Sequence, residues 1–238
     1  MPEPAPTRDD THRPHARARN TVHDAPQHSS HPQYWLADTH LMHSLPPAAW
    51  TLFRLAECKR GGTASHMWRV GQLAWRFAQT LEMPAIEAQA LGLAAALHDT
   101  GKLCIPNSIL EKPGRLTAEE IRVMRMHPQL GADILSALGG AACDLAASVA
   151  RTHHERFDGG GYPFGLSGHR IPLAGRIVAL VDVFDALASH RPYRAALTPA
   201  QIVKAMLAER GRHFDPWLLD RFLARALVPA LAISSGAR

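Results

Sequence analysis

The sequence predicts an all-α fold, a bundle of helices around a core made mainly of leucine and alanine. Of the 238 residues 46% are hydrophobic but only 6% are aromatic, so leucine and alanine, both strong helix formers, must fill most of the interior. No alternating run of apolar and polar residues is long enough to predict a β-strand. The length fits one domain with an appended tail, or two small domains.

Composition also narrows the class of protein. No segment approaches the roughly 20 apolar residues of a membrane span, and the N-terminus lacks the apolar stretch of a signal peptide. The cysteines Cys58, Cys104 and Cys143 are widely spaced and indicate reduced thiols in a cytoplasmic protein. The net charge of +5 would suit a phosphate ester, nucleic acid or a membrane surface. Because long runs of Lys and Arg are absent, we expect no DNA partner.

Four segments are expected along the chain. Residues 1–32 are rich in Pro, His, Arg, Asp and Ser, so they cannot bury enough apolar surface to offset their ordering entropy and should form a disordered tail. Residues 33–60 would form a supporting helical segment, residues 61–228 the main domain and residues 229–238 a C-terminal tail.

The first two helices are predicted over residues 48–58 and 65–81. Two glycines end the first helix, and the second has apolar residues along one stripe. His66 lies four residues before Val70, on the inward face of the second helix. A polar side chain is therefore expected in the interior.

A third helix should deliver a His-Asp pair to the same interior. Pro84 suits its first turn, and its buried row is expected to be Ile86, Ala90, Leu93 and Leu97. His98 and Asp99 then arrive at its C-terminal end, where Gly101 stops it.

The middle of the chain contains a clear helix start. Thr117 and Glu120 form a capping box, which predicts a short helix that ends near Met126. His127 precedes Pro128, a typical helix-start proline, so His127 should lie at a corner between helices.

The next helices carry more polar groups. His153 shares a helix face with Leu145, His154 lies on the adjacent face, and a glycine-rich loop follows. A later helix carries Asp182 and Asp185 one turn apart. Two closing helices begin at recognisable start signals, Thr198-Pro199 with Gln201 and Asp215-Pro216.

Seven of these polar residues are candidate metal ligands. Imidazole and carboxylate groups pack poorly in a core unless each has a partner, so a cluster of them is most simply explained by metal ions. A lone histidine is more often a hydrogen-bonded core residue, and only the joint pattern supports a metal site. The candidates are His66, His98, Asp99, His127, His153, His154 and Asp182.

Seven nitrogen and oxygen ligands suit two metals better than one. Asp99 is a plausible bridge, because a carboxylate has two oxygens. Two metals can stabilise both the attacking and the leaving oxygen of a phosphoryl displacement, with a hydroxide held between them as the nucleophile. A set without thiolates favours iron or manganese over a structural zinc. The sequence therefore predicts a metal-dependent hydrolase.

Three cationic side chains could serve this chemistry. Lys102, three residues after Asp99, could place a positive charge beside a phosphate, although away from a His-Asp pair it would be an ordinary surface lysine. Arg191 and Arg194 could clamp a second phosphate or a guanine edge, and a solvated basic turn would explain them nearly as well.

At these residues the chain resembles the HD-GYP family, a branch of the HD-domain metal-dependent phosphohydrolases. A His-Asp pair alone would be a weak motif, whereas many matches in one order are specific. The resemblance covers about residues 65–223, and its matching stretches are residues 98–102, 105–110, 112–114, 127–128, 153–163, 171–172, 174–177, 182–187 and 191–194.

The resemblance implies an HD-domain-like helical bundle with a buried two-metal site formed by the same seven ligands. It implies hydrolysis of cyclic di-GMP, a bacterial second messenger used in signalling, to linear pGpG and, in many members, GMP. Asp99 and Lys102 would be catalytic. Some members have a glutamate for a third metal four residues before the first histidine, where this chain has Gly62, so two metals are expected.

The resemblance also implies residues that surround the substrate. Asp185, Arg191 and Arg194 would have roles around the site or on the nucleotide. Tyr162, in the Gly-Tyr-Pro loop, would help to shape the pocket, and this loop would contact a partner such as a diguanylate cyclase.

Two alternatives to a cyclic di-GMP phosphodiesterase stay open. An HD phosphohydrolase acting on another cyclic dinucleotide or nucleotide would use the same metals. A non-catalytic adaptor that senses the dinucleotide would belong to a different class of protein, but such modules usually lose ligands, and all seven are present here.

Overall fold

The computed structural model describes residues 47–58, 63–189 and 195–227, and within these ranges every regular element is helical, as predicted. No described helix has the length and apolar character needed to cross a membrane. The expected tails and most of the expected supporting segment lie outside the described residues. The α-helices are α2 (Pro47–Cys58), α3 (Thr63–Thr80), α4 (Ala85–Ala96), α5 (Asn107–Leu110), α6 (Ala118–Met124), α7 (His127–Leu138), α8 (Ala141–Thr152), α9 (Leu173–Ala188), α10 (Pro199–Ala208) and α11 (Pro216–Phe222).

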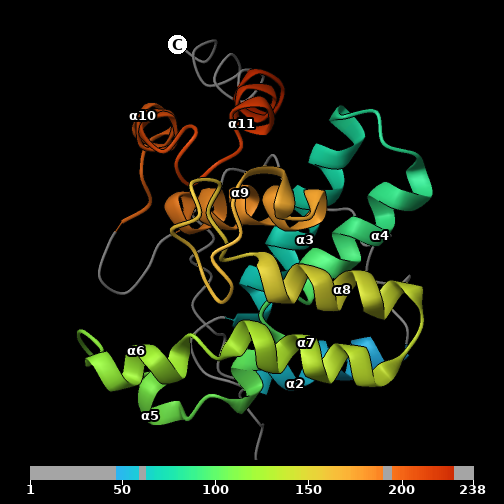
Figure 1. The fold of residues 1–238 in the computed structure, drawn as a ribbon, viewed down its shortest axis with the longest axis vertical. Helices are drawn as coiled ribbons and strands as arrows, with labels where there is room; N and C mark the ends of the chain where they lie inside the picture. Colours follow the sequence, from blue (N-terminus) through green and yellow to red (C-terminus); the bar gives the residue numbers. More distant parts are fainter. Residues whose placement is uncertain (1–46, 59–62, 190–194, 228–238) are drawn as a thin grey trace, which may run out of the picture. The chain divides into compact units, whose positions relative to one another are not determined.

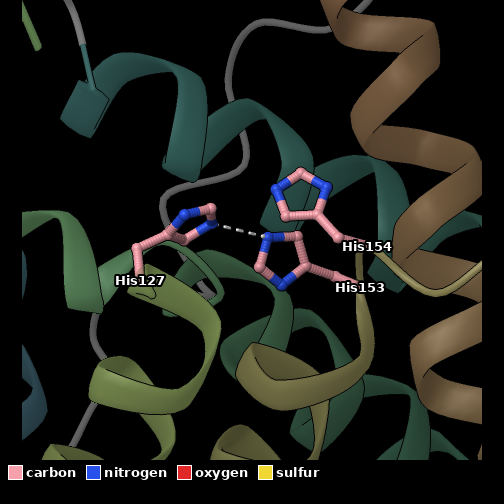
Figure 2. Close-up of side chains that lie close together, drawn as sticks. All are labelled: His127, His153 and His154. Atoms are coloured by element: carbon pink, nitrogen blue, oxygen red, sulfur yellow. Dashed lines mark hydrogen bonds between the residues drawn. The ribbon is translucent and has the colours of Figure 1, made fainter. Parts of the chain in front are cut away.

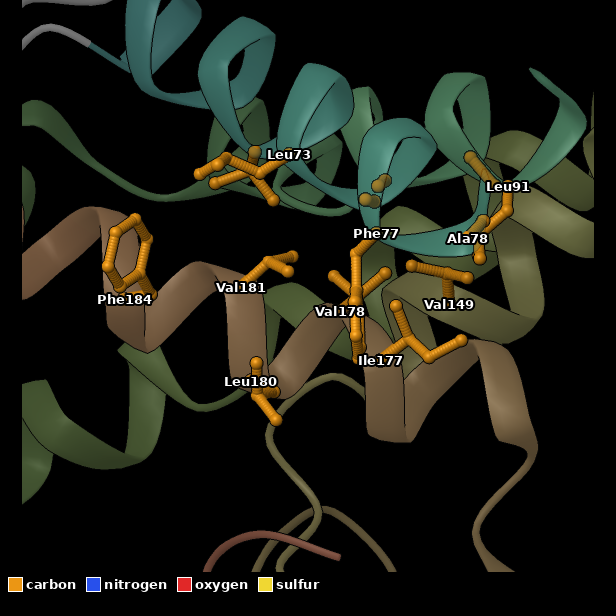
Figure 3. Close-up of a cluster of buried hydrophobic side chains, with 14 of the residues drawn as sticks. Leu73, Phe77, Ala78, Leu91, Val149, Ile177, Val178, Leu180, Val181 and Phe184 are labelled. Carbon is orange, nitrogen blue, oxygen red and sulfur yellow. The ribbon is translucent and has the colours of Figure 1, made fainter. Parts of the chain in front are cut away.

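Helices α3, α4, α7, α8 and α9 enclose the core. Helix α3 packs on α4 and α9, while α8 packs on α4, α7 and α9 (Figure 1). Figure 3 shows Leu73 and Phe77 of α3 facing Val178 and Val181 of α9, with Val149 of α8 beside them. This arrangement gathers the ends of several helices at one place, where the polar candidates lie.

Helix α4 follows its predicted range, but its predicted buried row is only partly confirmed: Leu97 is buried and Leu93 packs partly buried on the core, whereas Ile86 is wrong. Ile86 is 76% exposed, whereas Ala88, Leu91 and Ala95 are buried. Nearly every side chain of α4 is apolar, so periodicity could not identify the face that packs on α3. Gly71 of α3 allows that close packing, since a Cβ at this position would lie 2.8 Å from the Cβ of Ala96 in α4.

Gly101 has a different role from the expected helix stop. Helix α4 already ends at Ala96, and Gly101 lies inside a 3-10 helix, Thr100–Cys104. A Cβ on Gly101 would lie 1.9 Å from the carbonyl oxygen of His127. The absence of a side chain therefore lets the His-Asp segment contact the start of α7 directly.

Three helix starts are confirmed. Thr117 and Glu120 form both hydrogen bonds of a capping box at α6, and Thr198 and Gln201 do the same at α10. At α11 the Asp215 carboxylate accepts hydrogen bonds from the first backbone N–H groups. Each signal is local, because it joins residues within one turn.

Candidate metal centre

The structure brings all seven candidate ligands together, each from the end or inner face of an element. His66 lies in the first turn of α3, His127 opens α7, and Asp182 comes from the middle of α9. His98 and Asp99 follow α4, and His153 and His154 follow α8. His98, Asp99, His127 and His153 are buried, while His66, His154 and Asp182 are partly exposed.

Asp99 lies between two groups of histidines. Its Oδ2 is 3.3 Å from His98 Nε2 and 3.9 Å from His66 Nε2. Its Oδ1 is 3.3 Å from His127 Nε2 and 3.8 Å from His153 Nε2. Each oxygen of one carboxylate thus faces a different group, which is the arrangement a bridging ligand needs.

Backbone hydrogen bonds fix the orientation of three of these rings. The Nδ1 atoms of His98, His127 and His153 donate to the carbonyl oxygens three residues earlier, over 2.7–2.8 Å. A carbonyl only accepts, so the proton of each neutral ring is on Nδ1. The Nε2 lone pairs are therefore free and point toward Asp99 and one another.

Two of these lone pairs face each other. His127 Nε2 and His153 Nε2 are 3.3 Å apart, with His154 beside them (Figure 2). A hydrogen bond between them would need a doubly protonated ring, but burial lowers the pKa of both His127 and His153. A cation between the two nitrogens is the simpler explanation of this geometry.

The polar atoms that lack partners also fit metal ions. His98 Nε2 and Asp99 Oδ1 are buried and have no hydrogen-bond partner among the described residues. Two sets of ligand atoms, each within 4.8 Å of one another, could each hold an ion: those of His66, His98 and Asp99, and those of His127, His153 and His154. The cluster is therefore competent to bind metal.

The protonation states differ between the two groups. Burial lowers the pKa of His154 to about 3, so this side is neutral at physiological pH. Burial alone would lower the pKa of His66, but its hydrogen bonds with Asp182 and Asp185 raise it to about 9. Burial would raise the pKa of Asp99, but the Lys102 ammonium and the adjacent His98 ring hold it well below its usual value.

The other expected site residues have different surroundings. The Lys102 ammonium lies 2.5 Å from Asp99 Oδ2 and is partly exposed. Tyr162 stacks on the His154 ring with 4.8 Å between centroids, and the Arg125 guanidinium lies 5.0 Å from the Tyr162 ring centre. Arg191 and Arg194 lie outside the described residues.

Asp185 is buried beside the ligands, and both of its carboxylate oxygens already accept hydrogen bonds from the protein. His66 Nδ1 donates to its Oδ2 over 2.7 Å, and Arg69 donates to both of its oxygens over 2.7 and 3.0 Å. Sequence reasoning missed Arg69. The signal that could have found it is its position one turn after His66 on the same helix face.

A second missed residue is Glu155, directly after the two histidines. It is 1% exposed, and its two oxygens accept the backbone N–H groups of Phe164 and Leu166. A Cβ on Gly161 would lie 2.4 Å from the backbone nitrogen of Arg156, so the loop packs tightly against the backbone here. Glu155 and Gly161 together hold the loop that brings Tyr162 to His154.

Known proteins are similar to this chain in sequence and in fold. A family model described as an HD domain matches residues 51–218. The chain is 46% identical over 176 residues to the cyclic di-GMP phosphodiesterase response regulator RpfG of Xanthomonas campestris pv. campestris (strain 8004), over 73% of this chain and 47% of the relative. It is 40% identical over 174 residues to 3'3'-cGAMP-specific phosphodiesterase 2 of Vibrio cholerae serotype O1, over 73% of this chain and 33% of the relative.

A solved structure supports the fold. The HD domain of the L. monocytogenes phosphodiesterase PgpH, in complex with cyclic-di-AMP, is similar with a TM-score of 0.58 and 18% identity, over 77% of this chain and 96% of that one. The chain spans less than half the length of the two curated relatives above. The family model matches most of the chain, and the motifs from the His-Asp pair to the Gly-Tyr-Pro loop occur in the order of the family. The chain therefore belongs to the HD-domain family, in its HD-GYP branch.

Proposed function

We propose that this chain is a metal-dependent phosphodiesterase that hydrolyses cyclic di-GMP to linear pGpG, the product that many family members cleave further to GMP. The observation that carries the proposal is the position of Asp99, whose two oxygens face two separate histidine groups. The name of the Xanthomonas relative supports cyclic di-GMP as the substrate.

Each metal would have its own histidines and share Asp99. His66, His98 and Asp182 would hold one ion, and His127, His153 and His154 the other. When bound, two ions would polarise the scissile phosphate and lower the pKa of the attacking water. The fixed Nδ1 hydrogen bonds keep the Nε2 lone pairs aimed at the ions without reorganisation during the reaction.

Lys102 would act on the substrate. Its ammonium is paired with Asp99 and partly exposed, so it can rotate toward a phosphate oxygen at the same place. There it would offset the negative charge that grows on the phosphate oxygens in the transition state. We also propose that Tyr162 shapes the pocket and that Arg191 and Arg194 contact the nucleotide.

Asp185 and Arg69 would position a ligand rather than touch substrate. The Asp185 carboxylate accepts the Nδ1 proton of His66, which leaves His66 Nε2 free for the metal and fixes the ring plane. Arg69 binds both oxygens of Asp185 and so holds the carboxylate in place.

We propose iron or manganese as the metal. Every candidate ligand atom is a nitrogen or an oxygen, and thiolate ligands are absent from both described groups. Metal analysis of protein purified without oxygen tests this identity. Zinc alone at full occupancy, with full activity, would contradict it.

Anaerobic turnover of cyclic di-GMP by manganese- or iron-loaded protein tests the activity. We expect linear products from the wild type and none from the His98→Ala, Asp99→Ala double variant. The exposed carboxylate of Asp133 provides a matched control, since Asp133→Asn should retain wild-type turnover. No turnover by metal-loaded wild type would refute the proposed substrate.

A second substrate class is favoured by one specific observation. Among the relatives, one that is 40% identical to this chain is named for 3'3'-cGAMP. Turnover of a panel with cyclic di-GMP, 3'3'-cGAMP and cyclic di-AMP at equal concentrations separates these substrates. Tight binding without turnover of any of them would instead support a sensing adaptor.

We further propose a diguanylate cyclase as a partner of the Gly-Tyr-Pro loop. Phe164, next to this loop, is 57% exposed and offers an apolar contact. Binding of a purified cyclase domain, compared between wild type and Phe164→Ser, tests it, and equal affinities would count against it. We propose a cytoplasmic location, because the described cysteines Cys104 and Cys143 are unpaired.

A further inference from the structure

A cavity separate from the metal centre lies between α8 and the segment that follows the Gly-Tyr-Pro loop. Its volume is about 360 Å³, and its walls include Ser136 of α7, Arg151 of α8, Phe164, Leu166 and Pro172. None of the seven candidate ligands lines it. The volume falls in the range of pockets that hold small molecules.

Arg151 is the unusual group in this cavity. Its Nε is buried and has no hydrogen-bond partner among the described residues. Other arginines of the described chain, such as Arg176 and Arg69, are paired with carboxylates. A buried N–H without a partner is rare and costs free energy, so an acceptor from outside the chain is the simplest complement.

The cavity's acidic residue does not neutralise Arg151. Asp144 is seven residues earlier on α8, a rise of roughly 10 Å along the helix axis. The described structure contains no ion pair between them. The guanidinium is therefore not paired with the carboxylate of the same lining, and a guanidinium fork matches carboxylate or phosphate oxygens.

Part of the cavity lining is apolar and held in place. Phe164 is 57% exposed, and Leu166 lies beside the same space. The buried Glu155 carboxylate accepts the N–H of Phe164 over 2.8 Å and that of Leu166 over 2.9 Å. Because these two residues are already anchored, a ligand would not have to order them on binding.

We propose that this cavity binds a small organic anion, a carboxylate or a phosphate monoester, with its charge on Arg151 and its apolar part against Phe164. This site is independent of the phosphodiesterase activity proposed above, and its test involves no turnover. A bound molecule would contact the same loop whose Tyr162 stacks on His154.

Binding of benzoate and phenyl phosphate to the full chain, followed by calorimetry and by NMR, tests the proposal. We expect saturable binding of one or both probes, about tenfold weaker in Arg151→Gln and weakened less in Arg151→Lys. Exposed Arg115 is the matched control, and Arg115→Gln should bind as the wild type does. Asp144→Asn should bind a few-fold more tightly, because a like charge is removed from the cavity.

Three results would overturn it. Equal binding of neutral benzamide would make the cavity apolar rather than anion-selective. Loss of binding in Lys102→Gln, with full binding in Arg151→Gln, would place the anion at the metal centre. Absence of saturable binding by both probes, in protein whose unfolding temperature is normal, would remove the site altogether. Preference for benzoate or for phenyl phosphate then identifies which anion the cavity takes.

Discussion

Asp185 Oδ2 accepts the Nδ1 proton of His66 over 2.7 Å, although the two residues are 119 positions apart in the sequence. Asp185 is also held by Arg69, whose Nε donates to Oδ1 and whose terminal Nη2 donates to Oδ2. The ring of His66 is thereby turned so that Nε2 lies 3.0 Å from Asp182 Oδ1. One helix of the bundle thus fixes a ligand of another.

Asp185→Asn should weaken metal binding by about 10–100-fold, because the amide can donate to His66 and no longer fixes its tautomer. The loss should concern one of two metals, since His127, His153 and His154 do not contact Asp185. Metal titration measures the affinity, and the ¹⁵N shifts of His66 report the tautomer. Asp133→Asn is the surface control, and an unchanged tautomer in Asp185→Asn would contradict the positioning role.

Asp99→Asn should impair both metals, whereas His66→Ala should impair one. Only Asp99 faces both histidine groups, through its two oxygens. Metal content by elemental analysis after dialysis checks this pattern. Loss of two ions in Asp99→Asn and of one in His66→Ala is expected, and equal losses in the two variants would argue against a bridging carboxylate.

Metal binding at the His66 group should tighten as pH rises toward about 9. Between pH 6.5, the ordinary pKa of histidine, and pH about 9, His66 of the folded, metal-free protein keeps its second proton. A metal that binds Nε2 must displace that proton. At the other group the pKa of His154 is lowered to about 3, so no proton competes above neutral pH. Calorimetry in buffers of different ionisation enthalpy measures the protons released. Proton release that is the same for both metals would rule out this difference.

Gly101→Ala should destabilise the fold by about 3 kcal/mol, because its Cβ would overlap the carbonyl oxygen of His127 and force the two segments apart. Thermal unfolding measures this change. Gly160→Ala is the matched control, since its nearest neighbour is the end of the exposed Asp158 side chain, and it should be close to neutral. Equal unfolding temperatures for both variants would mean that the contact at Gly101 relaxes without cost.

Local signals in the sequence determined much of this protein. The capping pairs Thr117 with Glu120 and Thr198 with Gln201 join residues within one turn, so their helix starts could be predicted without knowing any neighbour. The all-α class followed from the same kind of information. The seven polar candidates also converge as expected, because each stands at an end or inner face that periodicity could locate.

Tertiary packing decided the rest. Helix α4 is apolar on nearly every side, so only its contact with α3 determined that Ile86 would be exposed. The role of Gly101 depends on the approach of α7. The Arg69–Asp185 pair joins two helices through residues that are 116 positions apart in the sequence. Such contacts have no period and no fixed spacing along the chain. They exist only after helices have packed, because packing alone chooses which side chains meet.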